Sequence, residues 1–172
     1  DDWVNNGLIG SLSGSSLIIT NWTNNGTITE DGGGTASLGG TWINNNTLGV
    51  SGGSTLNLSG SGTWAASATA LTTDAASQAN FSGSITNPGT LALSGAGTYL
   101  WQGAALLGGT ATLSNGAVLT VTSAGGVLNG VTVNGDVNLA EGQLTIVNGL
   151  TLNGTATVGT SSLDSYGYLY LV

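Results

Sequence analysis

The stretch Trp22-Thr23-Asn24-Asn25-Gly26-Thr27-Ile28 recurs along the chain, and this recurrence decides the fold. Similar stretches begin at Trp3 and Trp42, and a degraded copy begins at Trp64, so successive tryptophans are 19, 20 and 22 residues apart. Asn87 occupies the same place in a further copy that lacks the tryptophan. Repeats of this length are typical of solenoids, in which each repeat stacks on its neighbour.

A second pair of segments repeats with the same period. Val127–Gly135 matches Ile146–Gly154 at an offset of 19 residues. Within both segments apolar and polar residues alternate, as in half-buried strands, and Asn-Gly pairs mark turns. A β-sandwich needs longer strands and no such identity repeat. We therefore predict one all-β domain, residues 1–172, folded as a parallel β-solenoid of about 19–22 residues per coil, with an irregular Ala-rich coil at residues 64–80.

Stacked coils place equivalent residues about 4.8 Å apart, so identical side chains form ladders. Asparagine suits the corners because it tolerates the left-handed conformation. The repeat predicts one tryptophan ladder and two asparagine ladders. Their members are Trp3, Trp22, Trp42 and Trp64; Asn5, Asn24 and Asn44; and Asn6, Asn25 and Asn45.

The composition excludes many functions. The chain has 172 residues and a net charge of −8, with no Lys, Arg, His or Cys. Phosphate or nucleic-acid binding needs basic residues, and thiolate or imidazole metal sites and Ser-His-Asp catalysis need Cys or His. No run of 18 apolar residues is present, so we expect no membrane insertion. We expect no cofactor and no nucleic-acid partner.

The repeats resemble those of known bacterial exoproteins. Leu91–Tyr99, followed by Gly108-Gly109-Thr110, is similar to the passenger repeats of autotransporters, and the Asn-Asn-Gly-Thr-Ile and Asn-Gly-Leu-Thr-Leu elements resemble filamentous-haemagglutinin-type repeats. The resemblance implies a right-handed parallel β-helix on a bacterial surface, serving as an adhesin, biofilm factor or fibre.

The end of the chain, residues 165–172, reads as a β-strand with Tyr on one face and Leu on the other. An uncovered strand of this kind exposes unpaired N–H and C=O groups and favours pairing with another chain. We predict that it contacts a neighbouring subunit or an adjoining segment of a longer chain. The contact residues are Tyr166, Tyr168, Leu169, Tyr170 and Leu171.

The carboxylates of Asp and Glu are the remaining candidates for catalysis or metal binding. Asp136 and Glu141 flank a turn and are candidates for a glycosidase pair, and Glu30 and Asp31 are candidates for a weak calcium site. The alternative, which we favour, is that all acids are solvated turn residues. The acids are Asp1, Asp2, Glu30, Asp31, Asp74, Asp136, Glu141 and Asp164.

Two binding functions are further alternatives. Thr-x-Thr elements such as Thr27-Ile28-Thr29 and Thr110-Ala111-Thr112 could order water, as in ice-binding proteins, but their irregular offsets argue against a single ladder. Trp101 lies outside the tryptophan repeat and is a candidate for stacking on a surface glycan, which would make the protein a monomeric glycan-binding adhesin module.

These observations favour a structural protein over an enzyme. We expect a subunit or segment of an extracellular fibre on a bacterial cell surface, assembled end to end with copies of itself or with adjoining segments of a longer chain. At about 4.8 Å per coil, one chain would form a rod on the order of 40 Å long.

Overall fold

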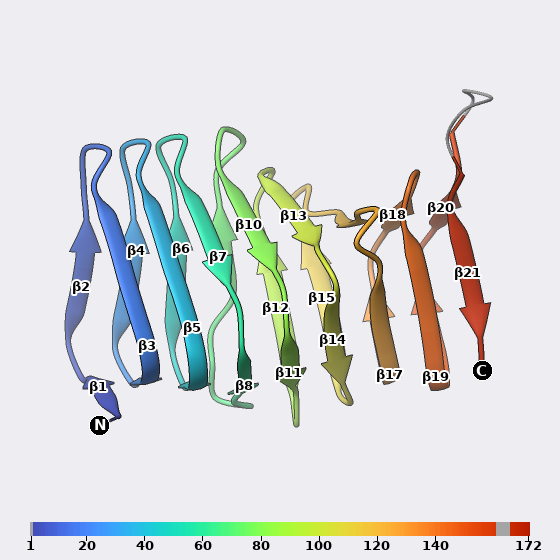
Figure 1. Ribbon diagram of the computed structural model, residues 1–172, viewed down its shortest axis with the longest axis horizontal. Coiled ribbons are helices and arrows are strands. Elements are labelled where there is room, and N and C mark those ends of the chain that lie inside the picture. Colours follow the sequence, from blue (N-terminus) through green and yellow to red (C-terminus); the bar gives the residue numbers. More distant parts are fainter. Residues whose placement is uncertain (1, 161–165) are drawn as a thin grey trace.

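The computed structural model describes residues 2–160 and 166–172. These residues form a parallel β-solenoid of about eight turns with roughly 20 residues per coil, as the repeat predicts. All pairings among the described strands are parallel, and each strand between the two end coils pairs with strands of the coils before and after it (Figure 1). The predicted right-handed coiling stays a prediction.

Each coil contributes a strand to three columns, which we name A, B and C. Several long strands bend at a corner and serve two columns. Column A contains the first parts of β3 (Ser16–Asn24) and β5 (Thr35–Asn44), then β7 (Thr55–Leu58), β10 (Gln78–Phe81), β13 (Thr98–Trp101), β16 (Leu119–Val121), β18 (Val137–Leu139) and β20 (Ala156–Val158).

Column B contains β1 (Trp3–Asn5), the second parts of β3 and β5, β8 (Ser61–Trp64), β11 (Ser84–Thr86), β14 (Ala104–Leu107), the first parts of β17 (Gly126–Asn134) and β19 (Gln143–Asn153), and β21 (Tyr168–Leu171). Column C contains β2 (Leu8–Ser11), β4 (Thr27–Glu30), β6 (Thr47–Val50), β9 (Leu71–Thr73), β12 (Thr90–Ser94), β15 (Thr110–Ser114) and the second parts of β17 and β19.

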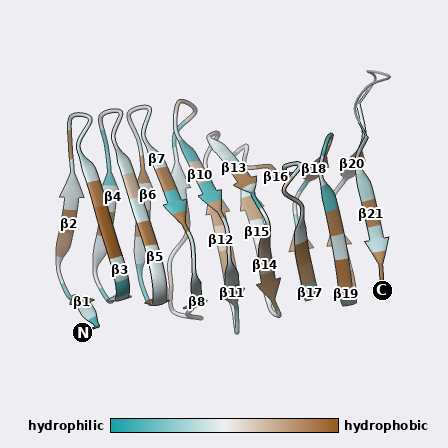
Figure 2. Ribbon diagram, in the orientation of Figure 1, coloured by the Kyte–Doolittle hydropathy of each residue, from teal (hydrophilic) through white to brown (hydrophobic). Residues whose placement is uncertain are grey.

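The alternation of apolar and polar residues sets which side chains point inward. In β7, Leu56 and Leu58 are buried while Thr55 and Asn57 are partly exposed. The same alternation runs through β4, β6 and β10, so the inward residues of successive coils stack into one continuous core. Figure 2 shows the apolar residues as bands that cross the strands.

At the corner between columns A and B the backbone adopts a left-handed conformation, which favours Asn or Gly. Asn21 lies within β3 with φ of 55°, and its Oδ1 accepts a hydrogen bond from the Thr41 N–H at 2.9 Å. Gly40 takes a positive φ of 74° at the corresponding corner of the next coil, where a Cβ would collide with Asn21. Asn and Gly adopt this left-handed conformation more readily than other residues.

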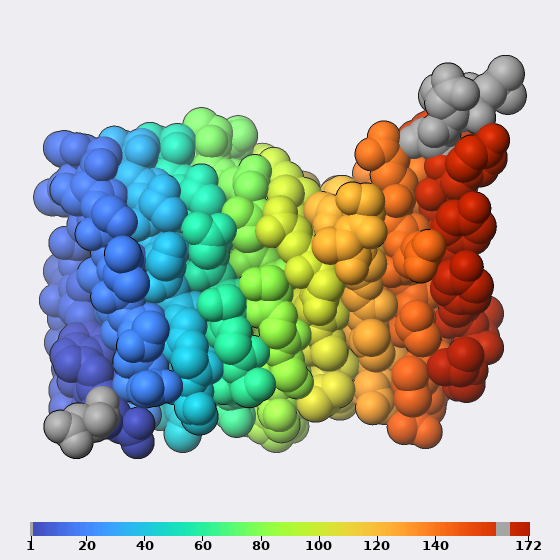
Figure 3. All heavy atoms as spheres, viewed as in Figure 1, coloured from blue at the N-terminus to red at the C-terminus, as the bar shows by residue number. Residues whose placement is uncertain are grey.

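The coils differ in length, and this changes the outer surface. Asn57 and Asn80 face each other in adjacent coils although 23 residues separate them, whereas Asn129 and Asn148 are only 19 apart. The longer spacing contains the Ala-rich stretch of residues 64–80, where β9 has only three residues. In the second half of the chain, the strands of column A are shorter, and β16, β18 and β20 have three residues each. Figure 3 shows a hollow in the outline in the yellow-to-orange part of the chain.

Candidate functional site

The two predicted asparagine ladders lie side by side at the corner between columns B and C. In the inner ladder Asn5 Nδ2 donates to Asn24 Oδ1, and Asn24 Nδ2 donates to Asn44 Oδ1, both at 2.8 Å. These three side chains are buried. Nδ2 of Asn24 also donates to the Thr47 carbonyl at 3.1 Å, so the inner ladder satisfies backbone groups inside the corner.

The outer ladder is exposed and runs in the opposite direction. Asn25 Nδ2 donates to Asn6 Oδ1 at 2.9 Å, and Asn45 Nδ2 donates to Asn25 Oδ1 at 2.7 Å. Both ladders bond one coil to the next along the solenoid axis. At the end of the inner ladder, Asn44 Nδ2 donates to the Asn46 carbonyl of its own turn at 2.8 Å, so these amides are used in holding the corner together.

The tryptophan ladder contains three of the four predicted residues. Trp22 and Trp42 stack with ring centroids 5.4 Å apart and planes inclined by 8°, and Trp3 pairs in register below Trp22. Trp64 does not continue the ladder, which corrects the sequence prediction. It pairs with Asn44, while Gly62 pairs with Trp42, because the coil is 20 residues long and Trp64 lies two residues too late.

Gly62 shows why the ladder stops at Trp42. A Cβ at Gly62 would lie within the Trp42 indole, so the ring covers the place where a side chain from the next coil would point. The Trp42 Nε1–H donates to the Ser59 carbonyl at 2.9 Å and fixes the ring in this position.

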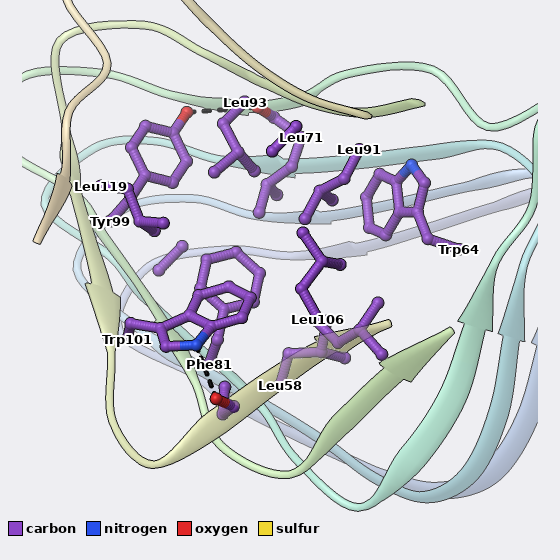
Figure 4. Packing of buried hydrophobic residues seen from close by; sticks show 14 of the residues in the cluster. Leu58, Trp64, Leu71, Phe81, Leu91, Leu93, Tyr99, Trp101, Leu106 and Leu119 are labelled. Carbon is purple, nitrogen blue, oxygen red and sulfur yellow. Dashed lines mark hydrogen bonds between the residues drawn. The ribbon is translucent and has the colours of Figure 1, made fainter. Parts of the chain in front are cut away.

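Trp101 is fully buried, so the prediction of an exposed platform for a surface glycan is wrong. Its Nε1–H donates to the Ala104 carbonyl at 2.6 Å, and its ring packs 5.2 Å from Phe81 (Figure 4). Tyr99 is buried beside it and donates to the Ser94 carbonyl at 2.6 Å. Burial raises the pKa of Tyr99, opposed by its hydrogen bonds. The alternation Tyr99-Leu100-Trp101 could have indicated that both rings point inward.

Glu30 also departs from the sequence prediction. The sequence predicts a solvated turn residue or a calcium ligand, yet the side chain is 1% exposed and neither carboxylate oxygen has a hydrogen-bond partner among residues 2–160 and 166–172. Its register partner in the next coil is Val50. The signal was present in the sequence, since Ile28 and Glu30 lie two residues apart on one face of β4.

Asp31 and Asp74 belong to the turns between columns C and A. Asp31 Oδ1 accepts from the Ser51 hydroxyl at 2.9 Å, and Asp74 Oδ2 accepts from the Gly52 N–H at 2.8 Å. The hydrogen bond from Ser77, followed by that from Gly52, lowers the pKa of Asp74 below its ordinary value. Among the described residues no group of three or more acids could hold a metal ion.

Asp136 and Glu141 lie near the narrowed part of column A. Asp136 borders a groove of about 330 Å³ together with Val118, Asn138 and Thr157. Its Oδ1 accepts from the Thr155 N–H at 2.8 Å, so this oxygen stabilises the stacking of two coils. Glu141 lines a neighbouring hollow. Asp1 and Asp164 lie outside the described residues.

The threonine elements divide between two columns. Thr27 and Thr29 lie on β4 of column C, as do Thr110 and Thr112 on β15, whereas Thr120 and Thr157 lie on column A. The register also brings together a threonine row on column C that sequence reasoning missed. That row comprises Thr90, Thr110, Thr132 and Thr151.

Exposed apolar side chains gather at the two ends of the solenoid. Fourteen large apolar or aromatic residues are exposed among those described, and twelve of them lie in the first or last coil. Ile43 and Val118 are the other two. The end coils contain Trp3, Val4, Leu8, Leu12 and Ile18, and Val158, Tyr166, Tyr168, Leu169, Tyr170, Leu171 and Val172.

The first coil is apolar on its outer faces as well as on its open end. Val4, Leu8 and Ile18 point outward from columns B, C and A and are 49%, 72% and 73% exposed. The residues in the same rows one coil later are polar: Thr23, Thr27 and Ser37. At the end of a solenoid, inward side chains are exposed because no further coil covers them. The exposed outward apolar residues are therefore a separate property of this coil.

The last described strand, β21, pairs with β19 on one edge. Leu169 and Leu171 continue the rows of Leu144 and Ile146, which are buried. Tyr168 and Tyr170 stand on the outer face with ring centroids 6.0 Å apart and planes inclined by 13°. Of the predicted strand at residues 165–172, residue 165 lies outside the described residues, and Tyr166 is exposed before β21 begins.

The described segments contain no helix long and apolar enough to cross a membrane. Comparison with protein-family models, with curated proteins and with solved structures finds no match.

Proposed function

We propose that this chain is an extracellular structural protein, a subunit or segment of a β-solenoid fibre that assembles end to end. The observation that carries the proposal is the concentration of exposed apolar side chains in the first and last coils. Burial of apolar surface is the main driving force for most protein association. Between the two end coils, Ile43 and Val118 are the only exposed large apolar residues among those described, so association through the ends is favoured over association through the middle of the rod.

The end strands supply the second element of the proposal. β21 has a partner on one edge only among the described residues, and so does β1. Unpaired N–H and C=O groups on such edges pair with strands from another chain by β-augmentation. A head-to-tail contact that does not close produces an open filament.

The composition supports a location outside the cell. A chain without Lys or Arg offers no cleavage site to trypsin-like proteases, and stacked coils favour neutral ladder residues because identical charges would repel at each step. The adjoining unit is either a second copy or a further segment of a longer chain. We place the rod on a bacterial cell surface by its resemblance to autotransporter-passenger and filamentous-haemagglutinin-like repeats.

Electron microscopy of a dilution series tests the proposal. We expect filaments that persist on dilution, whereas discrete rods on the order of 40 Å, the length of one stacked chain, would overturn it. Leu171→Asp should abolish filaments because Leu171 is 76% exposed at the open end. Ile43→Asp is the matched control, since Ile43 is 42% exposed on the side of the rod.

The groove on column A favours a second candidate, a glycan-binding adhesin module. Asn138, Asp136 and Thr157 place polar groups beside the apolar Val118, and sugars present both hydroxyls and apolar faces. Glycan-array binding that Asn138→Ala removes would support this function. Ser37→Ala is the control, because Ser37 points outward on the same column but lies outside the groove. Binding unchanged by Asn138→Ala would exclude the groove.

A further inference from the structure

Glu30 has a buried carboxylate whose charge no side chain of this protein balances. It is the only acid with a buried side chain among the described residues, and neither of its oxygens has a hydrogen-bond partner there. The sequence contains no Lys, Arg or His, so no side chain can supply the opposite charge. Burying an ionised carboxylate is costly unless it is paired. A partner for this charge therefore has to come from solution.

The carboxylate of Glu30 faces a backbone oxygen of the preceding coil. A Cβ added to Gly34 would collide with both Oε1 of Glu30 and the carbonyl oxygen of Ser15, so these two oxygens converge on one point. The Ser15 carbonyl already accepts a hydrogen bond from the Thr35 N–H at 3.0 Å, and its second lone pair remains. Two acceptors that meet without a donor repel each other, and a cation between them would replace this repulsion by attraction.

Gly34 leaves space at a place where the neighbouring coils have a side chain. In the next coil the Oγ of Ser54 accepts a hydrogen bond from the Gly33 N–H at 3.1 Å, so a side chain fits this corner. The backbone of Gly34 does not adopt the left-handed conformation that favours glycine. The space beside the Glu30 carboxylate therefore comes from the missing side chain. The corresponding residues of the coil before and the two coils after it are Ser15, Ser54 and Ser77.

We propose that Glu30 and the Ser15 carbonyl bind a sodium ion between the first two coils. Oxygen ligands suit hard cations. One carboxylate balances a single positive charge, whereas a divalent ion would bring a second, uncompensated charge into the core. The neighbouring Asp31 is directed elsewhere, since its Oδ1 accepts from the Ser51 hydroxyl at 2.9 Å. The space is that of one side-chain carbon atom, which suits sodium better than the larger potassium ion.

A bound sodium ion would join the first two coils from the inside. Ser15 immediately precedes β3 and Glu30 is the last residue of β4, so the ion contacts each coil through one of them. The unfolded chain does not hold these two oxygens together, so binding stabilises the folded state as the sodium concentration rises. In sodium-free solution the carboxylate stays unbalanced, and an apolar residue in place of Glu30 should stabilise the protein there. The site does not depend on end-to-end assembly, so either proposal can fail without the other.

Thermal unfolding in two salts tests the site. We expect the Tm of the wild type to be about 2–4 °C higher in sodium chloride than in tetramethylammonium chloride at the same concentration, because the bulky cation does not fit the space. Glu30→Gln should show no such difference, since a neutral amide can donate to the Ser15 carbonyl and carries no charge for the ion to balance. Asp31→Asn is the matched control, because it removes one acid beside the site and should keep the wild-type gain. An equal gain in Glu30→Gln would overturn the proposal.

A second variant fills the space and leaves the carboxylate in place. Gly34→Ala puts a Cβ where Oε1 of Glu30 and the Ser15 carbonyl converge, so it should abolish the gain in sodium chloride. Ser54→Ala changes the corresponding place of the next coil, away from the carboxylate, and should keep the gain. A gain retained by Gly34→Ala would show that sodium binds elsewhere and would contradict the proposed site.

Sodium NMR measures binding to the folded protein directly. At equal protein concentration the wild type should broaden the sodium resonance more than Glu30→Gln does, because only the wild type has the carboxylate. Potassium chloride added to the wild type should restore little of the narrow line, since potassium is too large for the space. Equal line widths for the two proteins, together with equal Tm values in the two salts, would show that a proton and not sodium accompanies the carboxylate, and the proposal would fall.

Discussion

The first three coils and the coils of β10 and β13 fill the same interior in different ways. In the first region identical residues stack, as in the Trp22–Trp42 pair and the inner asparagine ladder. In the second, the inward places hold different large residues, Phe81, Tyr99 and Trp101, which interlock without repeating. The spacing between coils changes from 19 or 20 residues to 23 where one region gives way to the other.

This difference lies in the side chains of the inward rows and not in coil length alone, because Asn80 still donates to Asn57 across the 23-residue coil. A ladder bond needs like polar side chains at register positions of consecutive coils, and extra residues at a corner leave the strands of column A, such as those of Asn57 and Asn80, in register. Large apolar side chains have no such requirement, because dispersion contacts are not directional. The first region therefore combines stacked, buried indoles with repeated polar contacts, and the second depends on unlike buried rings.

Trp101→Ala should cause the largest loss in the free energy of unfolding in this comparison. Removing a fully buried indole in a packed core should cost about 3–5 kcal/mol, because the lost contacts leave a cavity. Trp3→Ala, at the exposed end of the stacked region, should cost less than about 2 kcal/mol. Urea denaturation followed by far-UV circular dichroism measures both. Equal losses would show that ring burial does not distinguish the two regions.

Asn24→Ala tests the laddered region. The change removes a buried side chain that donates to Asn44 and Thr47 and accepts from Asn5, leaving buried polar groups unsatisfied. We expect a loss of about 2–3 kcal/mol in the free energy of unfolding. Asn25→Ala, in the exposed ladder, should cost about 0.5–1 kcal/mol, since water can replace its partners. A similar cost for both would mean that burial is unimportant to the ladders.

The same contrast explains what the sequence could predict. The fold class, the coil length and the pairing of Trp3, Trp22 and Trp42 follow from identity repeats, because stacking identical residues requires them to recur. Trp64 was assigned by residue type, but the structure aligns Gly62 with Trp42. A short sequence motif does not show this two-residue change in register, because the number of residues per coil changes close to Trp64.

The prediction for Trp101 failed for a related reason. It breaks the tryptophan repeat because it belongs to column A rather than column B. Departure from a repeat therefore indicated a different column and not an exposed position.

Glu30→Val tests an inward row of the laddered region in which an acidic residue is followed by an apolar one. Register pairs Glu30 with Val50, so the same inward row holds a carboxylate that no described residue hydrogen-bonds and then an apolar side chain. Replacing Glu30 with the residue of the next coil should stabilise the protein by about 1–3 kcal/mol, because an unsatisfied buried polar group is removed. Thermal unfolding compares it with Asp31→Asn, which should be nearly neutral. Destabilisation by Glu30→Val would show that the carboxylate has a partner in solution.

Asp74 gives the smallest effect and the one that depends on pH. It lies in the first turn after the change in coil length, and its hydrogen bonds with Ser77 and Gly52 lower its pKa from the ordinary 3.8. A lowered pKa means that the ionised form favours the folded state, so this contribution is present above about pH 4 and is lost as the pH falls through the folded-state pKa. The stability difference between wild type and Asp74→Asn should therefore shrink as the pH is lowered from 5 to 2. Urea midpoints across this range measure it, and a difference that stays constant would mean that the turn holds Asp74 without favouring its charge.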